Sequence, residues 1–141
     1  MLTLRAIRRY CEDGIEKSLK QMEGELMVSG AYNRKKGHDF ERECAKQFRE
    51  VMPDTTIKRG IQTRGGAEDK VPDIIMPVFA PECKRTKQPN IRKAYEQAVE
   101  ACPKGKIPCA ITRANGQAPL FTLSMADMLD FIGEWYGSRE V

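Results

Sequence analysis

The sequence predicts an α/β fold, in which a central mixed β-sheet is flanked by helices. Segments with helical periodicity alternate along the chain with short apolar runs that are typical of strands. Glycine, proline and asparagine separate these segments, as expected for turns. A helical segment also lies between the predicted strands at Lys84 and Ile107, which indicates a crossover connection between them.

Length and composition predict one soluble domain. The 141 residues are enough for a sizeable core, and the chain is 40% hydrophobic and 31% charged. Because no apolar run approaches the roughly 18 residues of a membrane span, and the N-terminus lacks signal-peptide features, we expect a cytoplasmic protein. The five cysteines show no C-x-x-C spacing and accompany a single histidine, His38, so they are expected to be buried thiols and not zinc ligands.

Residues 1–30 are predicted to form an N-terminal helical extension. Its apolar residues recur at steps of three and four, which predicts an amphipathic helix over residues 3–27, or two helices broken near a glycine. The apolar positions are Leu4, Ile7, Cys11, Ile15, Leu19, Met22 and Leu26. This face can pack on its own domain or on a second subunit, which makes it a candidate dimerisation element.

Residues 31–123 are predicted to form the core. After a loop over residues 30–37, a helix is expected over residues 37–52, where Pro53 ends it. At 100° per residue, Glu41 lies inside the apolar stripe of this helix, whereas Glu43 lies on the opposite face. A carboxylate on a core-facing stripe is costly unless it is paired or bound to a metal, so Glu41 is a candidate functional residue.

The remaining elements follow in order. Short strands are expected at residues 56–59, 74–76 and 78–79, with a tight hairpin turn at Pro77. A helix capped by Asn90 should cover residues 91–102, and strands 107–112 and 119–123 should flank a turn. Residues 124–141 should form a last helix, started by a capping box of Ser124 and Asp127, with a core-facing stripe of Met125, Met128, Leu129, Ile132 and Trp135.

Three charged side chains converge on one edge of the predicted sheet. Residues two apart on a strand face the same side, so Glu82 and Lys84 project together, and the hairpin returns them beside Asp73. The alternative is that Asp73 caps a turn while Glu82 and Lys84 form an ion pair. The combination with Glu41 favours a site for a divalent cation and a phosphate.

Such a cluster can support phosphodiester hydrolysis. Asp73 and Glu82 are the expected ligands of Mg²⁺, which Mn²⁺ is expected to replace, and the backbone carbonyl of Cys83 is a plausible third ligand. Glu41 can reach the same ion directly or through water. Lys84 would orient or deprotonate the attacking water, or stabilise charge on the phosphate.

The positive charge is concentrated in the same segment. Residues 31–123 carry 18 basic and 11 acidic groups, a net charge of +7, whereas residues 124–141 have a net charge of −3 and residues 1–30 are neutral. This distribution suits DNA, although a solvated basic face would look the same. The expected DNA-binding residues are Arg34, Lys35, Lys36, Arg59, Arg64, Arg85 and Lys87.

Several short motifs resemble those of a known superfamily. Gly37-x-x-x-Glu41-Arg42-Glu43, Pro72-Asp73 and Glu82-Cys83-Lys84 are similar to the PD-(D/E)XK nucleases, and the opening Lys36-Gly37 most resembles archaeal-type Holliday junction resolvases and their phage-encoded relatives. The resemblance covers roughly residues 34–123. It implies a restriction-endonuclease-like core, a Mg²⁺-dependent DNA endonuclease that is usually a homodimer, and a phage origin, with the host cytoplasm as its location.

The same resemblance assigns roles to individual residues. The catalytic set would be Glu41, Asp73, Glu82 and Lys84, and residues 62–66 resemble a DNA-contacting loop. Gln97 matches a glutamine on the helix that follows and is an eighth expected DNA-binding residue. The expected function is therefore a structure-selective Holliday junction resolvase. The alternatives are a PD-(D/E)XK nuclease of another substrate class (nicking, restriction-type or end-processing) and a DNA-binding module without catalysis.

Overall fold

The computed structural model describes residues 30–53, 55–61 and 70–139. The helix predicted over residues 3–27 and the loop holding Arg64 lie outside this part of the chain. The elements occur in the order α2 (Gly30–Val51), β1 (Lys58–Arg59), β2 (Ile74–Ile75), β3 (Phe79–Thr86), α3 (Ile91–Ala101), β4 (Ile107–Ala114), β5 (Leu120–Thr122) and α4 (Met125–Gly137). The predicted α/β class is therefore confirmed.

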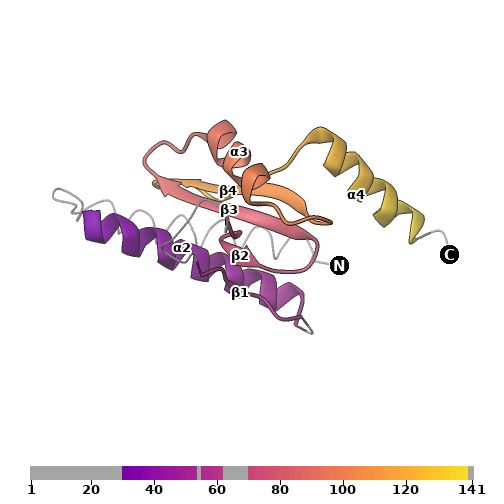
Figure 1. The fold of residues 1–141 in the computed structure, drawn as a ribbon, viewed down its shortest axis with the longest axis horizontal. Helices are drawn as coiled ribbons and strands as arrows, with labels where there is room; N and C mark the ends of the chain where they lie inside the picture. The colour runs from indigo at the N-terminus through magenta and orange to yellow at the C-terminus, as the bar shows by residue number, and fades with distance from the viewer. Residues whose placement is uncertain (1–29, 54, 62–69, 140–141) are drawn as a thin grey trace.

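The predicted mixed sheet with a crossover helix is present. Strands β3, β4 and β5 are neighbours in that order, β3 and β4 being parallel and β4 and β5 antiparallel. Helix α3 connects the parallel pair, and Asn90 caps it by accepting a hydrogen bond from the backbone N–H of Lys93. Figure 1 shows α3 on one face of this sheet and α2, with β1 and β2, on the other.

The predicted hairpin between β2 and β3 is wrong. Strand β2 instead pairs antiparallel with β1 in a separate two-stranded sheet. The chain turns sharply at Val78, whose φ is 69°, and the N–H of Phe79 donates to the carbonyl of Pro77 at 2.8 Å. This turn sends β3 toward β4. A 3.0 Å hydrogen bond from the Asp73 N–H to the Pro81 carbonyl still ties the start of β2 to β3.

The main core lies between α2 and the strands. It contains Phe40, Cys44 and Ala45 from the helix, packed against buried residues of the strands and of the segment before β1, which are Ile57, Ile74, Met76, Cys83 and Ile111. These helical positions are the stripe that the sequence predicts. The core therefore fixes the rotation of α2 about its axis, and with it the direction in which Glu41 points.

Helix α2 begins one and a half to two turns earlier than predicted. The expected loop over residues 30–37 is helical from Gly30. Arginine and lysine are good helix formers, and one interior glycine costs only about 1 kcal/mol, so the basic run continues the helix. In addition, the Nζ of Lys36 donates to Oδ1 of Asn115 at 2.9 Å, which ties this part of α2 to the turn between β4 and β5.

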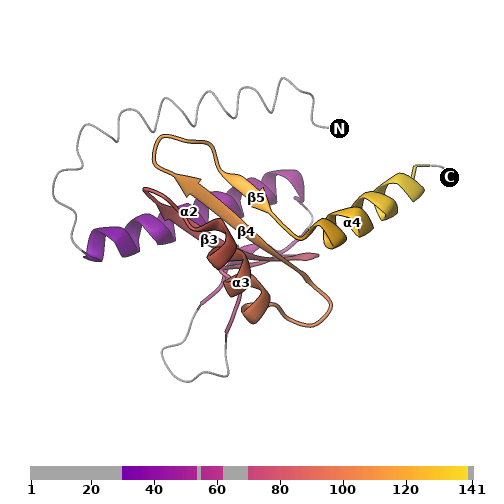
Figure 2. The same ribbon diagram turned by 90° about the horizontal axis from the view of Figure 1, so that it is seen from above.

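Helix α4 has the predicted cap but not the predicted environment. The backbone N–H of Asp127 donates to Ser124 Oγ at 3.0 Å, and Ser124 Oγ–H donates to Asp127 Oδ2 at 2.7 Å. The expected core-facing stripe is exposed instead, and α4 contributes no buried residue. Figure 2 shows α4 projecting away from the sheet. Within the described residues, no helix is both long and apolar enough to cross a membrane.

Candidate active site

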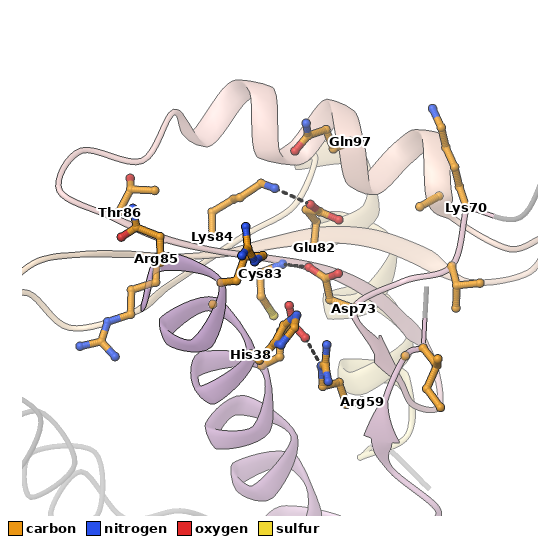
Figure 3. Close-up of a pocket in the computed structure, with 18 of the residues that line it drawn as sticks. His38, Arg59, Lys70, Asp73, Glu82, Cys83, Lys84, Arg85, Thr86 and Gln97 are labelled. Carbon is orange, nitrogen blue, oxygen red and sulfur yellow. Dashed lines mark hydrogen bonds and ion pairs between the residues drawn. The ribbon is translucent and has the colours of Figure 1, made fainter. Parts of the chain in front are cut away.

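Strand β3 places the predicted E-x-K pair as expected. Glu82 and Lys84 project from the same side of the strand, and the Nζ of Lys84 lies 3.0 Å from Oε1 of Glu82 (Figure 3). The Glu82 side chain is 11% exposed and that of Lys84 is 41% exposed. The carboxylate is therefore held at the floor of the site, while the ammonium can still reach a bound molecule.

Asp73 is fixed to the free edge of β3. Its Oδ2 accepts a 2.8 Å hydrogen bond from the backbone N–H of Cys83. On the other side, the N–H of Gly60 donates to the Asp73 carbonyl at 2.8 Å, and a Cβ added at Gly60 would lie 2.0 Å from the Pro72 carbonyl oxygen. Only glycine allows this approach. The segment after β1 therefore clamps Asp73 against β3.

Asp73 and Glu82 are two buried carboxylates whose negative charges repel one another. Asp73 and Glu82 are only 7% and 8% exposed. Burial, followed by the nearby negative charge of Glu82, raises the pKa of Asp73 from 3.8 to about 7, although the hydrogen bond from Cys83 opposes this shift. Two close, buried carboxylates disfavour one another's ionised form, and a cation between them would remove that cost.

Helix α2 delivers Glu41 to the same place. Its side chain is 13% exposed, whereas that of Glu43 is 47% exposed, as the helical phase predicts. Glu41 forms a short ion pair with Arg59 of β1, and its charge also contributes to the raised pKa of Asp73. Glu43 is not merely solvated, because Oε2 lies 3.6 Å from the Nη1 of the buried Arg113.

These side chains line one open cleft of about 940 Å³ between α2, β3 and α3. Figure 3 shows Glu82 and Lys84 beneath Gln97 of α3, with Asp73 and Arg59 on the opposite side of β3. The Oε1 of Gln97 is buried and has no hydrogen-bond partner among the described residues. The cleft therefore offers an unused acceptor beside the carboxylates.

The predicted DNA-binding residues divide into two groups. Arg34, Arg59, Arg85 and Gln97 line the cleft. Lys35 and Lys87 are exposed and are not among the lining residues, while Lys36 contacts Asn115 at its Oδ1. Arg64 lies outside the described residues. The structure thus brings four of the predicted positions to the carboxylate cluster. Lys35, Lys36 and Lys87 do not line the cleft.

Two further residues of the cleft were not selected from the sequence. His38, expected to be a surface or capping residue, is half-buried and lines the cleft. Its position three residues before Glu41 is the signal that could have identified it, since such residues share a helix face. No feature of the sequence points to Gly60, because the sequence does not reveal that the backbone at Pro72 lies against it.

Cys83, which lies beside the carboxylates, is not activated as a nucleophile. Cys83 and Cys44 are buried free thiols in the core, and their mutual contact and burial raise the pKa of Cys83. A thiol held in its protonated form is a poor nucleophile. The described cysteines are all free, and Cys44, Cys83 and Cys109 are buried as predicted, whereas Cys102 is only partly buried. Cys11 lies outside the described residues.

The carboxylates of the cleft include oxygen donors of the kind that a divalent cation prefers. Among the described residues, no group of three or more His, Cys, Asp or Glu side chains is arranged to hold a metal ion. Glu41 is paired with Arg59. Asp73 and Glu82 nevertheless supply two hard oxygen donors of the kind that Mg²⁺ prefers. The Cys83 carbonyl faces the same edge as the Cys83 N–H that contacts Asp73. These donors are of the chemical type that a magnesium ion keeping several waters would take.

Comparisons with known proteins leave the function to be argued from this cleft. No family model matches the chain, and no curated protein or solved structure is similar to it. The motif resemblance consequently rests on a few residues and their spacing. What the structure adds is that Glu41, Asp73, Glu82 and Lys84, which are distant in sequence, line a single cleft.

Proposed function

We propose that this protein is a metal-dependent DNA endonuclease of the PD-(D/E)XK superfamily, with a restriction-endonuclease-like core. One observation carries the proposal. Two buried carboxylates, Asp73 and Glu82, line the same cleft close enough for one charge to raise the pKa of the other, and the lysine on the strand of Glu82 lies 3.0 Å from it. A purely structural ion pair would not require a second buried carboxylate at the mouth of a cleft this large.

Asp73 and Glu82 would hold the metal, with the Cys83 carbonyl as a third donor. When bound, Mg²⁺ supplies Lewis-acid stabilisation of the phosphate and lowers the pKa of water. The hydrogen bond from the Cys83 N–H to Asp73 Oδ2 fixes the direction of the carboxylate. The raised pKa of Asp73 fits this role, because cation binding would favour the ionised form.

Lys84 is the residue best placed to act on the attacking water. Its ammonium is partly exposed in the cleft, and its contact with Glu82 holds it beside the carboxylates. In the reaction, the water oxygen forms a bond to phosphorus while the bond from phosphorus to the leaving alkoxide breaks. The water gives its proton to solvent, and the alkoxide takes a proton from solvent. Lys84 would orient the water and stabilise the negative charge that develops on the phosphate oxygens.

The cationic residues of the cleft would hold the DNA backbone. Arg34, Arg59 and Arg85 line it from α2, β1 and β3, so their charges surround the carboxylates from three elements. Phosphate contacts of this kind give affinity without sequence preference. Glu41 serves here as a positioning residue, since its ion pair holds Arg59 in place.

The finer proposal is a structure-selective enzyme that cuts four-way junctions as a homodimer. It is supported by the motif resemblance of residues 34–123. A four-way junction has approximate two-fold symmetry, so two copies related by a two-fold axis could address its paired strands. The phosphate contacts proposed above are indifferent to base sequence, which suits an enzyme that selects a DNA shape.

Cleavage of a matched set of DNAs tests this proposal. The wild-type protein is incubated with a labelled four-way junction, a flap, a linear duplex and a single strand, with Mg²⁺, with Mn²⁺ or with EDTA. We expect metal-dependent cleavage, strongest for the junction. Cleavage of another DNA with equal or greater efficiency would identify a nuclease of another substrate class. DNA binding without cleavage under every metal condition would indicate a binding module.

A further inference from the structure

The stretch from the end of β3 to the first turn of α3 is strongly basic. Residues 84–95 carry five basic and no acidic groups. Two of the five, Lys84 and Arg85, line the cleft. The other three are exposed and lie outside the cleft, and we call them the basic end surface: Lys87, Arg92 and Lys93. Cations of one continuous stretch thus stand both inside the proposed active site and beyond it.

The charges of the basic end surface are not neutralised by the part of the chain that the structure describes. The ion pairs in that part involve other cations, such as Arg59 with Glu41 and Lys84 with Glu82, and none involves the three residues of this surface. The surfaces of soluble domains usually intersperse charges of both signs. The positive field over the start of α3 is therefore available to an anionic partner.

The dipole of α3 argues against a purely stabilising role for these cations. Arg92 and Lys93 stand in the first turn of α3, which contains no acidic residue. Because the N-terminus of a helix carries a partial positive charge, cations are unfavourable there and carboxylates are favourable. Asn90 already caps this helix through the N–H of Lys93, so the two charges are not needed to start it. An anion bound over this end of α3 would offset the repulsion.

The cleft leads directly to the basic end surface. Figure 3 shows Glu82, Lys84 and Thr86 following one another along β3, with Thr86 at the end away from Lys70. Thr86 is the last residue of β3 and still lines the cleft, and Lys87 follows it. Five residues of extended chain span about 16 Å, so the surface begins roughly that far from Glu82. Since a DNA strand carries one phosphate per 3.4 Å of helix axis, this distance corresponds to about five nucleotides.

Helix α4 carries the opposite charge. Between Met125 and Gly137 it holds three acidic residues, Asp127, Asp130 and Glu134, and no basic residue. Figure 1 shows α4 at the end of the molecule away from the C-terminal end of β3. Phosphates are repelled by an acidic helix and attracted by a cluster of cations. The charge distribution therefore favours a DNA that leaves the cleft past Thr86 and runs away from α4.

We propose that the basic end surface holds the duplex arm on one side of the scissile phosphate, beginning about five base pairs from it. This inference rests on the proposed endonuclease function and adds Arg92 and Lys93 to the residues that contact DNA. Duplex DNA is stiff over this length, so an arm whose end is held in the cleft keeps its phosphates over the surface. The enzyme should therefore favour DNA with a duplex arm long enough to reach α3.

Fluorescence anisotropy with a charge-matched pair of variants tests this inference. Binding is measured with EDTA, on a labelled DNA whose cut position has been mapped. The arm variant combines Lys87→Ala, Arg92→Ala and Lys93→Ala, and the control variant combines Lys46→Ala, Lys58→Ala and Lys104→Ala at exposed positions elsewhere. The arm variant should lower the slope of log K against log salt by about 3, one for each phosphate contact, whereas the control variant should keep the wild-type slope. All six side chains are exposed, so both variants should keep the wild-type circular dichroism spectrum.

Shortened DNAs locate the contact relative to the cut. The duplex is cut back to less than the distance from the scissile phosphate to the basic end surface, first on one side of the cut and then on the other. The wild type should bind the full DNA and one shortened DNA at least about 10-fold more tightly than the arm variant does, and both proteins should bind the other shortened DNA equally. If the wild type cleaves DNA, an unchanged salt slope in the arm variant, or equal effects of the two truncations, would overturn this inference alone. A wild type that neither binds nor cleaves DNA would overturn the proposed function, and this inference with it.

Discussion

The backbone N–H of Cys83 lies 2.8 Å from Oδ2 of Asp73, so the strand that carries Glu82 and Lys84 also holds the second carboxylate of the site. This bond explains how the cluster survives although β2 and β3 do not form a hairpin. One main-chain donor on β3 replaces the ladder that the sequence predicts. The site is therefore built on the rigid strand β3, which gives it a fixed geometry before any ligand binds.

Asp73 should make the stability of the metal-free protein fall as the pH rises from 4 to 7. Its folded-state pKa is about 7 and its ordinary value is 3.8, so in this window the folded state binds more protons than the unfolded state. The loss can reach about 4 kcal/mol. In urea unfolding with EDTA, the advantage in stability of Asp73→Asn over the wild type should grow with pH. A pH-independent difference for Asp73→Asn would contradict the raised pKa.

Gly60→Ala should destabilise the fold. Its Cβ would lie 2.0 Å from the Pro72 carbonyl oxygen, so the backbone next to Asp73 must move. We expect a loss of at least about 2 kcal/mol in the free energy of unfolding, measured by urea titration. Gly37→Ala in α2, where an added Cβ meets nothing within 4 Å, should instead stabilise by about 0.5–1 kcal/mol. Equal stability of the two variants would argue against the clamp.

Much of the fold follows from local pattern, and the exceptions have physical causes. The helical phase of Glu41, the caps at Asn90 and Ser124, and the crossover of α3 all depend on near neighbours, and each is found as predicted. The hairpin prediction is wrong because Pro77 and Val78 form a turn that does not return the chain onto β2. Local sequence does not specify which of two available strands β2 will pair with.

The environment of α4 is a second feature that the sequence does not predict. Periodicity correctly predicts which residues share a face of this helix, but it does not identify what covers that face. The predicted core-facing stripe, from Met125 to Trp135, is exposed in the single chain. In the candidate site, likewise, Asp73, Glu82 and Lys84 could be proposed from the sequence pattern, whereas the role of Gly60 depends on a contact between distant segments.

Gln97→Met should change stability and cleavage activity in opposite directions. The Oε1 of Gln97 is buried without a hydrogen-bond partner among the described residues, so removing this acceptor should raise the free energy of unfolding by about 1 kcal/mol. If the acceptor serves a bound water or DNA, the same change should slow cleavage. Gln88→Met, at an exposed position, is the control and should alter neither quantity. If Gln97→Met changed neither stability nor activity, Gln97 would have no role in the proposed site.

Arg59→Ala should weaken DNA binding and reduce its dependence on salt. Arg59 lines the cleft, whereas its neighbour Lys58 on β1 is exposed and does not. Loss of one phosphate contact should lower the slope of log K against log salt by about 1. Fluorescence anisotropy at several salt concentrations would measure this slope, and Lys58→Ala should retain the wild-type value. Equal slopes for the two variants would show that Arg59 makes no phosphate contact.

The most direct test of the account is the single-turnover rate of Mg²⁺-dependent DNA cleavage by Glu82→Gln. The control is Glu100→Gln, which changes another glutamate of the same cleft that instead pairs with Lys70 at an exposed position. If Asp73 and Glu82 bind the metal, Glu82→Gln should cleave at least about 10³-fold more slowly than the wild type and still bind DNA, while Glu100→Gln should retain the wild-type rate. Cleavage by Glu82→Gln at the wild-type rate would contradict the proposed metal site.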